Sequence, residues 1–448
     1  MSDSTAVSGR RRALWIGGTV AVVFIALRTV PFAGARIGRG LDSFDFRASA
    51  QLPLFSRAFL AGERPFGYPL FLKIAHHERL AVVGQLVIST AAWLLLALLV
   101  VRVTNHRYLK IAGAVIVLGL GASFEAIQWD RVVASEALST ACGVGLLAAI
   151  LWLYERWTIP RLATVAVLAA AATSLRDSNG TFLGLVGVLL AVCVVVRWLP
   201  RRVLWLTLVF VVVAALGSAS ASAGRRWEGP LKDVITLRIL NSPERTQFFL
   251  DAGMPLTPAQ IKLARGNCVA PAPNLQCRVL VNPAFYRWIH DHGRATYVKS
   301  LAKFPATTLW EPLAHLRDSV GTRVRVELPF AADTQEHAPI STFFDAVFFV
   351  RNPLVLALWS IVMLALCALA LVAGWRGPFV LAGALVALTY PHLWLVWGGG
   401  ALEVARHSLL ASVQLRLGLW LSVLWLLDAR LSPRAAATEV EPADQSVD

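Results

Sequence analysis

The sequence predicts an all-α polytopic membrane protein with about ten transmembrane helices and a small, mostly helical extracytoplasmic domain. Of its 448 residues, 57% are hydrophobic and only 15% are charged. Soluble domains are nearer half apolar and a quarter charged. A water-soluble fold has no place for this much apolar side chain, whereas a bilayer does. The apolar residues are also gathered into long runs, which is the second observation that favours a membrane protein.

Ten apolar runs of roughly spanning length recur along the chain. A transmembrane helix needs about twenty predominantly apolar residues, and backbone groups in lipid must be satisfied within the segment, so each run predicts a helix. The third run contains Glu125 and the fifth is short, which makes their boundaries the hardest to place. The runs cover residues 13–33, 79–101, 111–128, 132–153, 161–175, 180–197, 203–223, 353–374, 378–397 and 407–428.

The basic residues predict the orientation of these helices. Arg10, Arg11 and Arg12 precede the first run, every second connection after it also carries Arg or Lys, and the connections between these carry acids. Because short basic connections stay in the cytosol, we expect a multi-pass protein of the inner or plasma membrane with both termini cytosolic. Topology therefore accounts for the net charge of +15, and no nucleic-acid partner is expected.

Composition divides the chain into four parts. Residues 1–223 predict an N-terminal transmembrane module of about seven helices, and residues 346–430 a C-terminal module of about three. Between them, the polar segment 224–345 regains helical periodicity and predicts the extracytoplasmic domain. Residues 431–448 are polar and acidic, which is typical of a disordered tail, here in the cytosol.

A first outer loop, residues 34–78, follows the first run. We expect an irregular stretch over 41–50 and then an amphipathic piece over 65–75, with Tyr68 near its start. The first run is nearly long enough to span on its own, which favours an uncleaved helix over a cleaved signal peptide.

Ionisable residues gather at the helix ends that the predicted topology places outside. Such residues at membrane depth are costly and by default suggest function. Asp42 and Asp45 also fit solvated loop acids, and the arginines fit side chains that snorkel to the headgroups. Glu136 is harder to explain in this way, because it lies inside an apolar run and requires a buried partner. The group comprises Asp42, Asp45, Asp130, Arg131, Glu136, Arg176, Asp177, Glu403, Arg406 and His407.

Common catalytic motifs are absent from the sequence. It has no HExxH, Walker A, GxSxG or dinucleotide-binding pattern. A nucleotide-driven step is therefore not expected, and a lipid-linked donor in the bilayer is one remaining source of an activated group. No cofactor and no metal site is predicted, although a divalent metal stays open.

The five cysteines fall into two groups. Cys142, Cys193 and Cys367 lie in apolar runs and are expected to be inert packing residues. Cys268 and Cys277 lie in the long polar segment, and if this segment is outside the cell they are close enough in sequence to form a disulfide.

Four stretches resemble the GT-C superfamily, the membrane glycosyltransferases that use polyprenyl-phosphate sugars, in its bacterial mannosyl, arabinosyl and lipid-sugar transferase branches. The acids in 41–46 (LDSFDF) follow the first helix, and 63–71 (ERPFGYPLF) is similar to an amphipathic Tyr-Pro stretch of many members. The Ser-Glu pair in 134–138 (ASEAL) and Arg406-His407 before the last run complete the likeness. Many members carry two adjacent acids in the first loop, whereas here the acids are three residues apart.

The resemblance implies an inverting transfer of a hexose or pentose from a polyprenyl-phosphate donor to an extracytoplasmic glycan or lipid acceptor. Asp42 or Asp45 would be the general base, and which of them stays open. Asp42 is favoured slightly, because Asp45 is near Arg47 in sequence and could be paired with it. The donor phosphate would contact Arg406, His407, Arg176 and Arg131, with support from Glu136, Tyr68, Asp177 and Glu403.

Two other functions fit a chain of this kind. One is a transporter or flippase for a lipid-linked or polar solute, and the other is a non-catalytic membrane scaffold. Transporters place ionisable groups near the membrane midplane, often in repeated halves, and no repeat is detected here. Convergence of Asp42, Glu136 and Arg176 with Arg406 at one site would favour the enzyme, and scattering over the lipid-facing perimeter would not.

Overall fold

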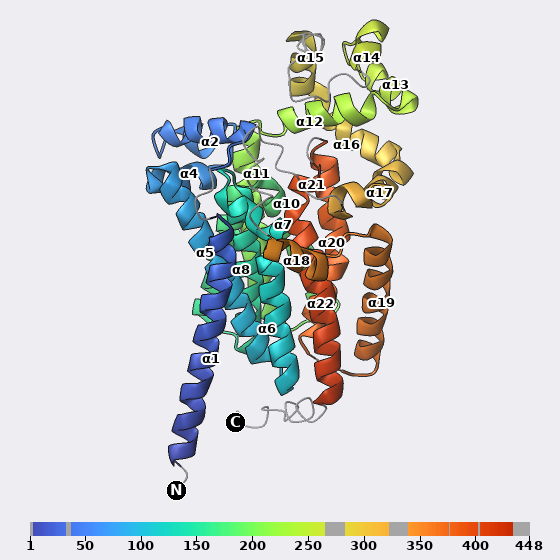
Figure 1. Cartoon of the computed structure of the whole chain (residues 1–448). Coiled ribbons are helices and arrows are strands. Elements are labelled where there is room, and N and C mark those ends of the chain that lie inside the picture. Colours follow the sequence, from blue (N-terminus) through green and yellow to red (C-terminus); the bar gives the residue numbers. More distant parts are fainter. Residues whose placement is uncertain are drawn as a thin grey trace, which may run out of the picture.

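The computed structural model describes residues 3–32, 37–264, 283–321, 339–375, 377–401 and 404–432. Within these ranges the regular structure is helical, with one isolated β-bridge between Gly38 and Val132. The predicted all-α class is confirmed for the described chain (Figure 1). The predicted disulfide cysteines, Cys268 and Cys277, lie outside the described residues, and so do residues 433–448 of the predicted tail.

The N-terminal module contains the helices before the long polar segment. They are α1 (Asp3–Thr29), η1 (Val30–Phe32), α2 (Leu41–Gln51), α3 (Arg57–Leu60), α4 (Gly67–Ala75), α5 (Glu78–Val103), α6 (Arg107–Ala122), α7 (Phe124–Ile127), η2 (Gln128–Arg131), α8 (Glu136–Glu155), α9 (Ile159–Leu175), α10 (Asp177–Val195) and α11 (Val203–Ala223).

Short helices follow, and then three long ones. The short helices are α12 (Glu228–Val234), η3 (Ile235–Ile239), α13 (Pro243–Asp251), α14 (Pro258–Ala264), α15 (Pro283–Trp288), η5 (Ile289–Gly293), α16 (Arg294–Lys303), α17 (Pro305–Ala314), η6 (Arg317–Gly321) and α18 (Pro339–Phe348). The last part contains α19 (Pro353–Val372), α20 (Phe379–Gly399), α21 (Val404–His407) and α22 (Leu409–Leu431).

Seven of the described helices are long and apolar enough to cross a membrane, namely α5, α8, α10, α11, α19, α20 and α22. An eighth span arises if α6 and the bent continuation Phe124–Arg131 are counted as one. The apolar part of α1, Gly17–Thr29, and α9 are shorter. All ten predicted runs therefore coincide with helices, but length and composition support seven or eight spans.

A bend of 53° interrupts the third predicted run. The helix ends at Ala122, and Ser123 has an extended backbone and donates its hydroxyl to the Leu120 carbonyl at 2.7 Å. Just after the bend, the buried Glu125 carboxylate is paired with Arg351 at 2.7 Å. The predicted run 111–128 therefore corresponds to two helices, α6 and α7, which can still be counted together as one bent span.

The bundle has two distinct ends (Figure 1). Helix α1 begins and helix α22 ends at the lower end in this view, whereas α2, α4 and α12–α17 lie at the upper end, here called the domain end. The centre is formed by α5, α6, α8 and α22, where Trp93 and Trp425 are buried. Each half of the chain thus contributes helices to one core.

The helices from α12 to α17, here called the loop domain, have their own apolar core. Ile235, Phe249 and Phe285 are fully buried within it. Helix α18 belongs elsewhere, because its Phe348 packs so closely on Gly119 of α6 that a Cβ there would lie 2.3 Å from the ring. The predicted domain boundary at 345 thus falls inside a helix that packs into the bundle.

Candidate functional site

The two predicted catalytic acids lie on a helix. An irregular stretch was expected over 41–50, but α2 covers Leu41–Gln51, with Asp42 in its first turn. That prediction was wrong because packing stabilises the helix: Phe46 is buried and meets Tyr68 edge to face, with 4.9 Å between ring centroids. Residues three apart on a helix share a face. The spacing of Asp42 and Asp45 therefore brings both carboxylates to one guanidinium, that of Arg64, each at 2.6 Å.

A continuous series of ion pairs leads from these acids to the start of α8. The second oxygen of Asp42 is 2.5 Å from Nη2 of Arg406, and Nε of Arg406 donates to Oε1 of Glu136. The same Glu136 oxygen accepts from Arg176 at 3.1 Å, and Arg176 also contacts Nδ1 of His407 at 2.9 Å. The series joins α2, α8, the α9–α10 junction and α21 (Figure 1).

Burial excludes the simplest alternatives for these residues. The Glu136 side chain is 0% exposed, and those of Arg406 and Arg176 are 12% and 13% exposed. These arginines are paired inside the fold, so they do not snorkel to lipid headgroups. Asp42, which is 21% exposed and held by two guanidiniums, is not a solvated loop acid, whereas Asp45 is 52% exposed.

The arginines control the charge of Asp42. Burial acts to raise the pKa of its carboxyl, but Arg406 and Arg64 outweigh burial and hold that pKa below its usual value. For Arg64, burial acts to lower the pKa of the guanidinium, but Asp42 and Asp45 raise it overall. With Glu136 and Arg176, the ion-pair cluster contains three guanidiniums and three carboxylates. Two of these carboxylates, Asp42 and Asp45, flank Arg64.

His407 differs from its neighbours in being uncharged. Burial, then Arg176 and then Arg406, lower the pKa of its imidazole to about 3. A guanidinium can only donate hydrogen bonds, so Nδ1 of His407 accepts from Arg176. The ring is then the tautomer with its proton on Nε2. It can therefore offer a neutral hydrogen-bond donor, and not a positive charge, to the phosphate that the sequence analysis assigned to it.

Tyr68 is connected through Gln85 to the segment that precedes Glu136. Its side chain is buried, and its hydroxyl donates to Oε1 of Gln85 at 3.2 Å. Burial and then the charge of Glu136 raise the pKa of Tyr68. Gln85 in turn donates to the carbonyls of Asp130 and Val132, at 2.7 Å and 2.9 Å. Tyr68 thus helps to fix the segment that leads into α8.

The remaining predicted residues have other surroundings. Asp177 forms a two-pronged pair with Arg226, at 2.8 Å and 2.9 Å. Asp130 pairs with Arg28, which is fully buried. Arg131 is buried in η2. Glu403 lies outside the described residues.

Arg64, Arg226 and Arg28 were missed as partners by the sequence reasoning. Arg28 carried a signal that was available, since it is an ionisable residue inside the first apolar run. Arg64 lies within the stretch that resembles the GT-C superfamily, but nothing local indicates that it binds two acids. Long-range pairing of this kind follows from the fold.

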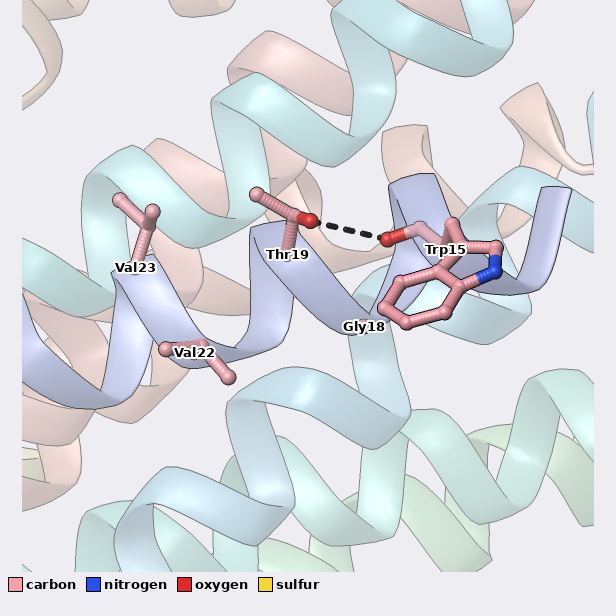
Figure 2. A pocket seen from close by; sticks show the side chains of 5 residues that line it. All are labelled: Trp15, Gly18, Thr19, Val22 and Val23. Carbon is pink, nitrogen blue, oxygen red and sulfur yellow. Dashed lines mark hydrogen bonds between the residues drawn. The ribbon is translucent and has the colours of Figure 1, made fainter. Parts of the chain in front are cut away.

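Neither a metal site nor the groove in Figure 2 belongs to this cluster. No group of three or more His, Cys, Asp or Glu residues suited to a metal ion occurs in the part of the chain that the structure describes.

The groove, of about 480 Å³, is lined by Trp15, Gly18, Thr19, Val22 and Val23 of α1. The Thr19 hydroxyl bonds to the Trp15 carbonyl at 2.9 Å (Figure 2). The groove thus offers mainly apolar atoms and no charged group.

The arrangement places a carboxylate, two nearly buried guanidiniums and a neutral imidazole at one end of a helical bundle. Such a group can bind an anion and accept a proton beside it. Comparisons with known proteins found no matching protein family, no similar curated protein and no similar solved structure.

Proposed function

We propose that this protein is an integral membrane glycosyltransferase of the GT-C type, which transfers a sugar from a polyprenyl-phosphate donor to an extracytoplasmic acceptor. The observation that carries the proposal is the contact between Asp42 and Arg406, at 2.5 Å, with Glu136 and Arg176 behind it. A proton acceptor and a phosphate ligand are thereby held side by side. The domain end of the bundle would face away from the cytosol.

In the proposed reaction, the acceptor hydroxyl attacks the anomeric carbon of the donor sugar. Its oxygen forms the new bond to that carbon while the bond from the carbon to the phosphate oxygen breaks. The proton of the hydroxyl moves to the Asp42 carboxylate, and the electron pair leaves with the lipid phosphate. A single displacement of this kind inverts the anomeric configuration.

The arginines stabilise the departing phosphate. Arg406 is held by Glu136, and Arg176 by Glu136 and His407, so both are oriented before the donor arrives. Hydrogen-bond donors that are oriented in advance need no reorganisation during the reaction. Guanidiniums also match the geometry of phosphate oxygens, which an ammonium group does not.

Donor binding would also release the base. In the structure both Asp42 oxygens contact guanidiniums, one from Arg406 and one from Arg64. A phosphate that takes Arg406 as its partner removes one of these contacts, and the carboxylate becomes a better proton acceptor. The chemistry therefore favours donor binding before acceptor binding.

The first outer loop has side chains suited to a membrane-borne donor. Phe55 is 93% exposed, and Phe44 of α2 and Ile74 of α4 are exposed as well. Apolar side chains on short helices at the end of a bundle are typical of a segment that lies in the lipid interface. Phe44 lies two residues from Asp42 on α2, which supports a donor that reaches the site from the bilayer.

The test is a transfer assay with the purified full-length protein in lipid nanodiscs, supplied with radiolabelled polyprenyl-phosphate sugars and membrane glycan acceptors. Wild type should transfer label, and Asp42→Asn/Asp45→Asn should lose about a hundred- to ten-thousandfold in rate. Equal label transfer by this double variant, at equal expression and folding, would refute the proposal. Vectorial movement of an unmodified lipid-linked sugar without transfer would favour the flippase instead.

A further inference from the structure

The end of α20 is close in sequence to Arg406 and His407. Helix α20 ends in glycines at Gly398 and Gly399, Gly400 follows, and Arg406 lies six residues beyond Gly400. A helix C-terminus leaves carbonyl groups without partners inside the helix, and successive glycines restrict the backbone least. The backbone at 398–400 is therefore fixed by the groups that bind its carbonyls.

Two side chains of the loop domain bind these carbonyls. Arg238 of η3 donates from Nη1 to the Trp397 carbonyl and from Nη2 to the Gly400 carbonyl, the latter at 2.9 Å. Tyr297 of α16 donates its hydroxyl to the Gly398 carbonyl at 2.8 Å. A cation at this position also interacts favourably with the negative end of the helix dipole.

The Trp397 ring is enclosed by the same domain. The Arg238 guanidinium carbon lies 3.6 Å from the ring centroid, and the His315 ring stacks on it at 4.7 Å. The indole nitrogen donates to Glu311 at 3.2 Å, and Glu311 is paired with Arg245 at 2.7 Å. The last turn of α20 is thus held from several sides by helices of the loop domain.

We propose that Arg238 and Tyr297 are positioning residues, which hold the end of α20 so that Arg406 and His407 reach Asp42, Glu136 and Arg176. Arg406 must keep hydrogen-bonding distance to both Asp42 and Glu136. A glycine segment without fixed ends would allow Arg406 to drift from these partners. Arg238 and Tyr297 would hold this segment whatever the protein does, whereas their effect on donor binding rests on the proposed function.

Hydrogen exchange of the purified full-length protein in lipid nanodiscs tests the claim about position. Tyr297→Phe removes one hydroxyl and keeps the ring, and Arg238→Lys keeps the charge but cannot bind both carbonyls. Both should speed exchange of the backbone amides at 404–409. Trp288→Phe is the matched control, because it removes a bond to the Ala252 carbonyl at 3.1 Å within the loop domain. Unchanged exchange in both test variants, or equal acceleration in the control, would overturn the proposal.

Affinity for a polyprenyl monophosphate alone tests the consequence. Tyr297→Phe and Arg238→Lys should weaken binding by up to about tenfold, which corresponds to one fully coupled hydrogen bond, and Trp288→Phe should bind as wild type does. Faster exchange with unchanged affinity would show that these residues do not position Arg406 and His407 for phosphate binding. A wild type that does not bind the probe would refute the proposed function, and the exchange result would still decide the claim about position.

Discussion

Asp42 and Arg406 are separated by 364 positions in the chain, yet their side chains are 2.5 Å apart. The other Asp42 oxygen is 2.6 Å from Arg64, which comes from the loop before α4. The carboxylate is therefore fully engaged, and it can act as a base once a competing anion binds one of the arginines. Asp45 differs from Asp42 in being more exposed, and the ion pair described for it is with Arg64.

The two single variants of these acids should separate their roles. Asp42→Asn is expected to lose about a hundred- to ten-thousandfold in transfer rate, because the proton acceptor is removed. Asp45→Asn should keep most of its activity, because Asp45 has no contact with Arg406 among the described ion pairs. Initial rates with saturating donor measure both. A larger loss in Asp45→Asn than in Asp42→Asn would assign the base to Asp45.

His407 is expected to make the protein less stable in mild acid. Burial and the two neighbouring arginines lower the pKa of its imidazole to about 3, whereas an unfolded histidine has a pKa of about 6.5. Between these values the unfolded chain binds a proton that the folded protein does not. The free energy of unfolding contributed by His407 is therefore complete above about pH 6.5 and falls as the pH drops toward 3.

The measurement is the thermal unfolding midpoint at pH 7 and pH 5, for wild type and for His407→Gln. The fall in midpoint between the two pH values should be smaller in the variant, which has no group to titrate. The lowered pKa of Asp42 acts only below its unfolded value of about 3.9, outside this window. An equal fall in both proteins would mean that His407 binds its proton normally in the fold.

The membrane part of the fold could be predicted because hydropathy is a local property. The run containing Trp93 and the run containing Trp425 appear in the sequence and in the structure as long helices. The helix α2 could not be predicted in this way, since its polar sequence is stabilised by Phe46 packing on Tyr68, a contact between separate segments. Likewise, hydropathy does not reveal the break at Ser123.

Most members of the site could be predicted from the sequence, but Arg64 and the contacts between the members could not. The sequence indicates that Glu136 needs a buried partner, because it lies in an apolar run. Which residues provide that partner depends on how α8, α21 and the α9–α10 junction pack, and the structure identifies Arg406 and Arg176. The neutral state of His407 follows from burial beside two arginines, which no local pattern encodes.

The buried pair of Arg28 and Asp130 should be important for stability and should tolerate removal as a unit. Both side chains are almost completely buried, and Arg28 also donates to Ser89 at 2.6 Å and to the Gly121 carbonyl. Arg28→Met leaves an uncompensated carboxylate and should lower the free energy of unfolding by about 3–5 kcal/mol. Arg28→Met/Asp130→Leu should recover part of this loss, because neither charge remains.

Thermal unfolding of the two variants in the same detergent measures this recovery. Wild type and Asp130→Asn complete the comparison, since the latter keeps the shape of the carboxylate but removes its charge. If the double variant unfolds at a lower temperature than Arg28→Met, the pair stabilises the fold through hydrogen bonds that apolar residues cannot replace.

The orientation of the bundle gives the last prediction. Helix α10 begins and helix α11 ends at the domain end, where Arg226 pairs with Asp177, so the α10–α11 connection lies at the other end. That connection is basic, which predicts a cytosolic location. In a cysteine-free background, a membrane-impermeant maleimide should label Lys299→Cys in intact cells and Arg201→Cys only after lysis, since both positions are exposed. The opposite pattern would place the Asp42 site in the cytosol and exclude a donor presented on the outer face.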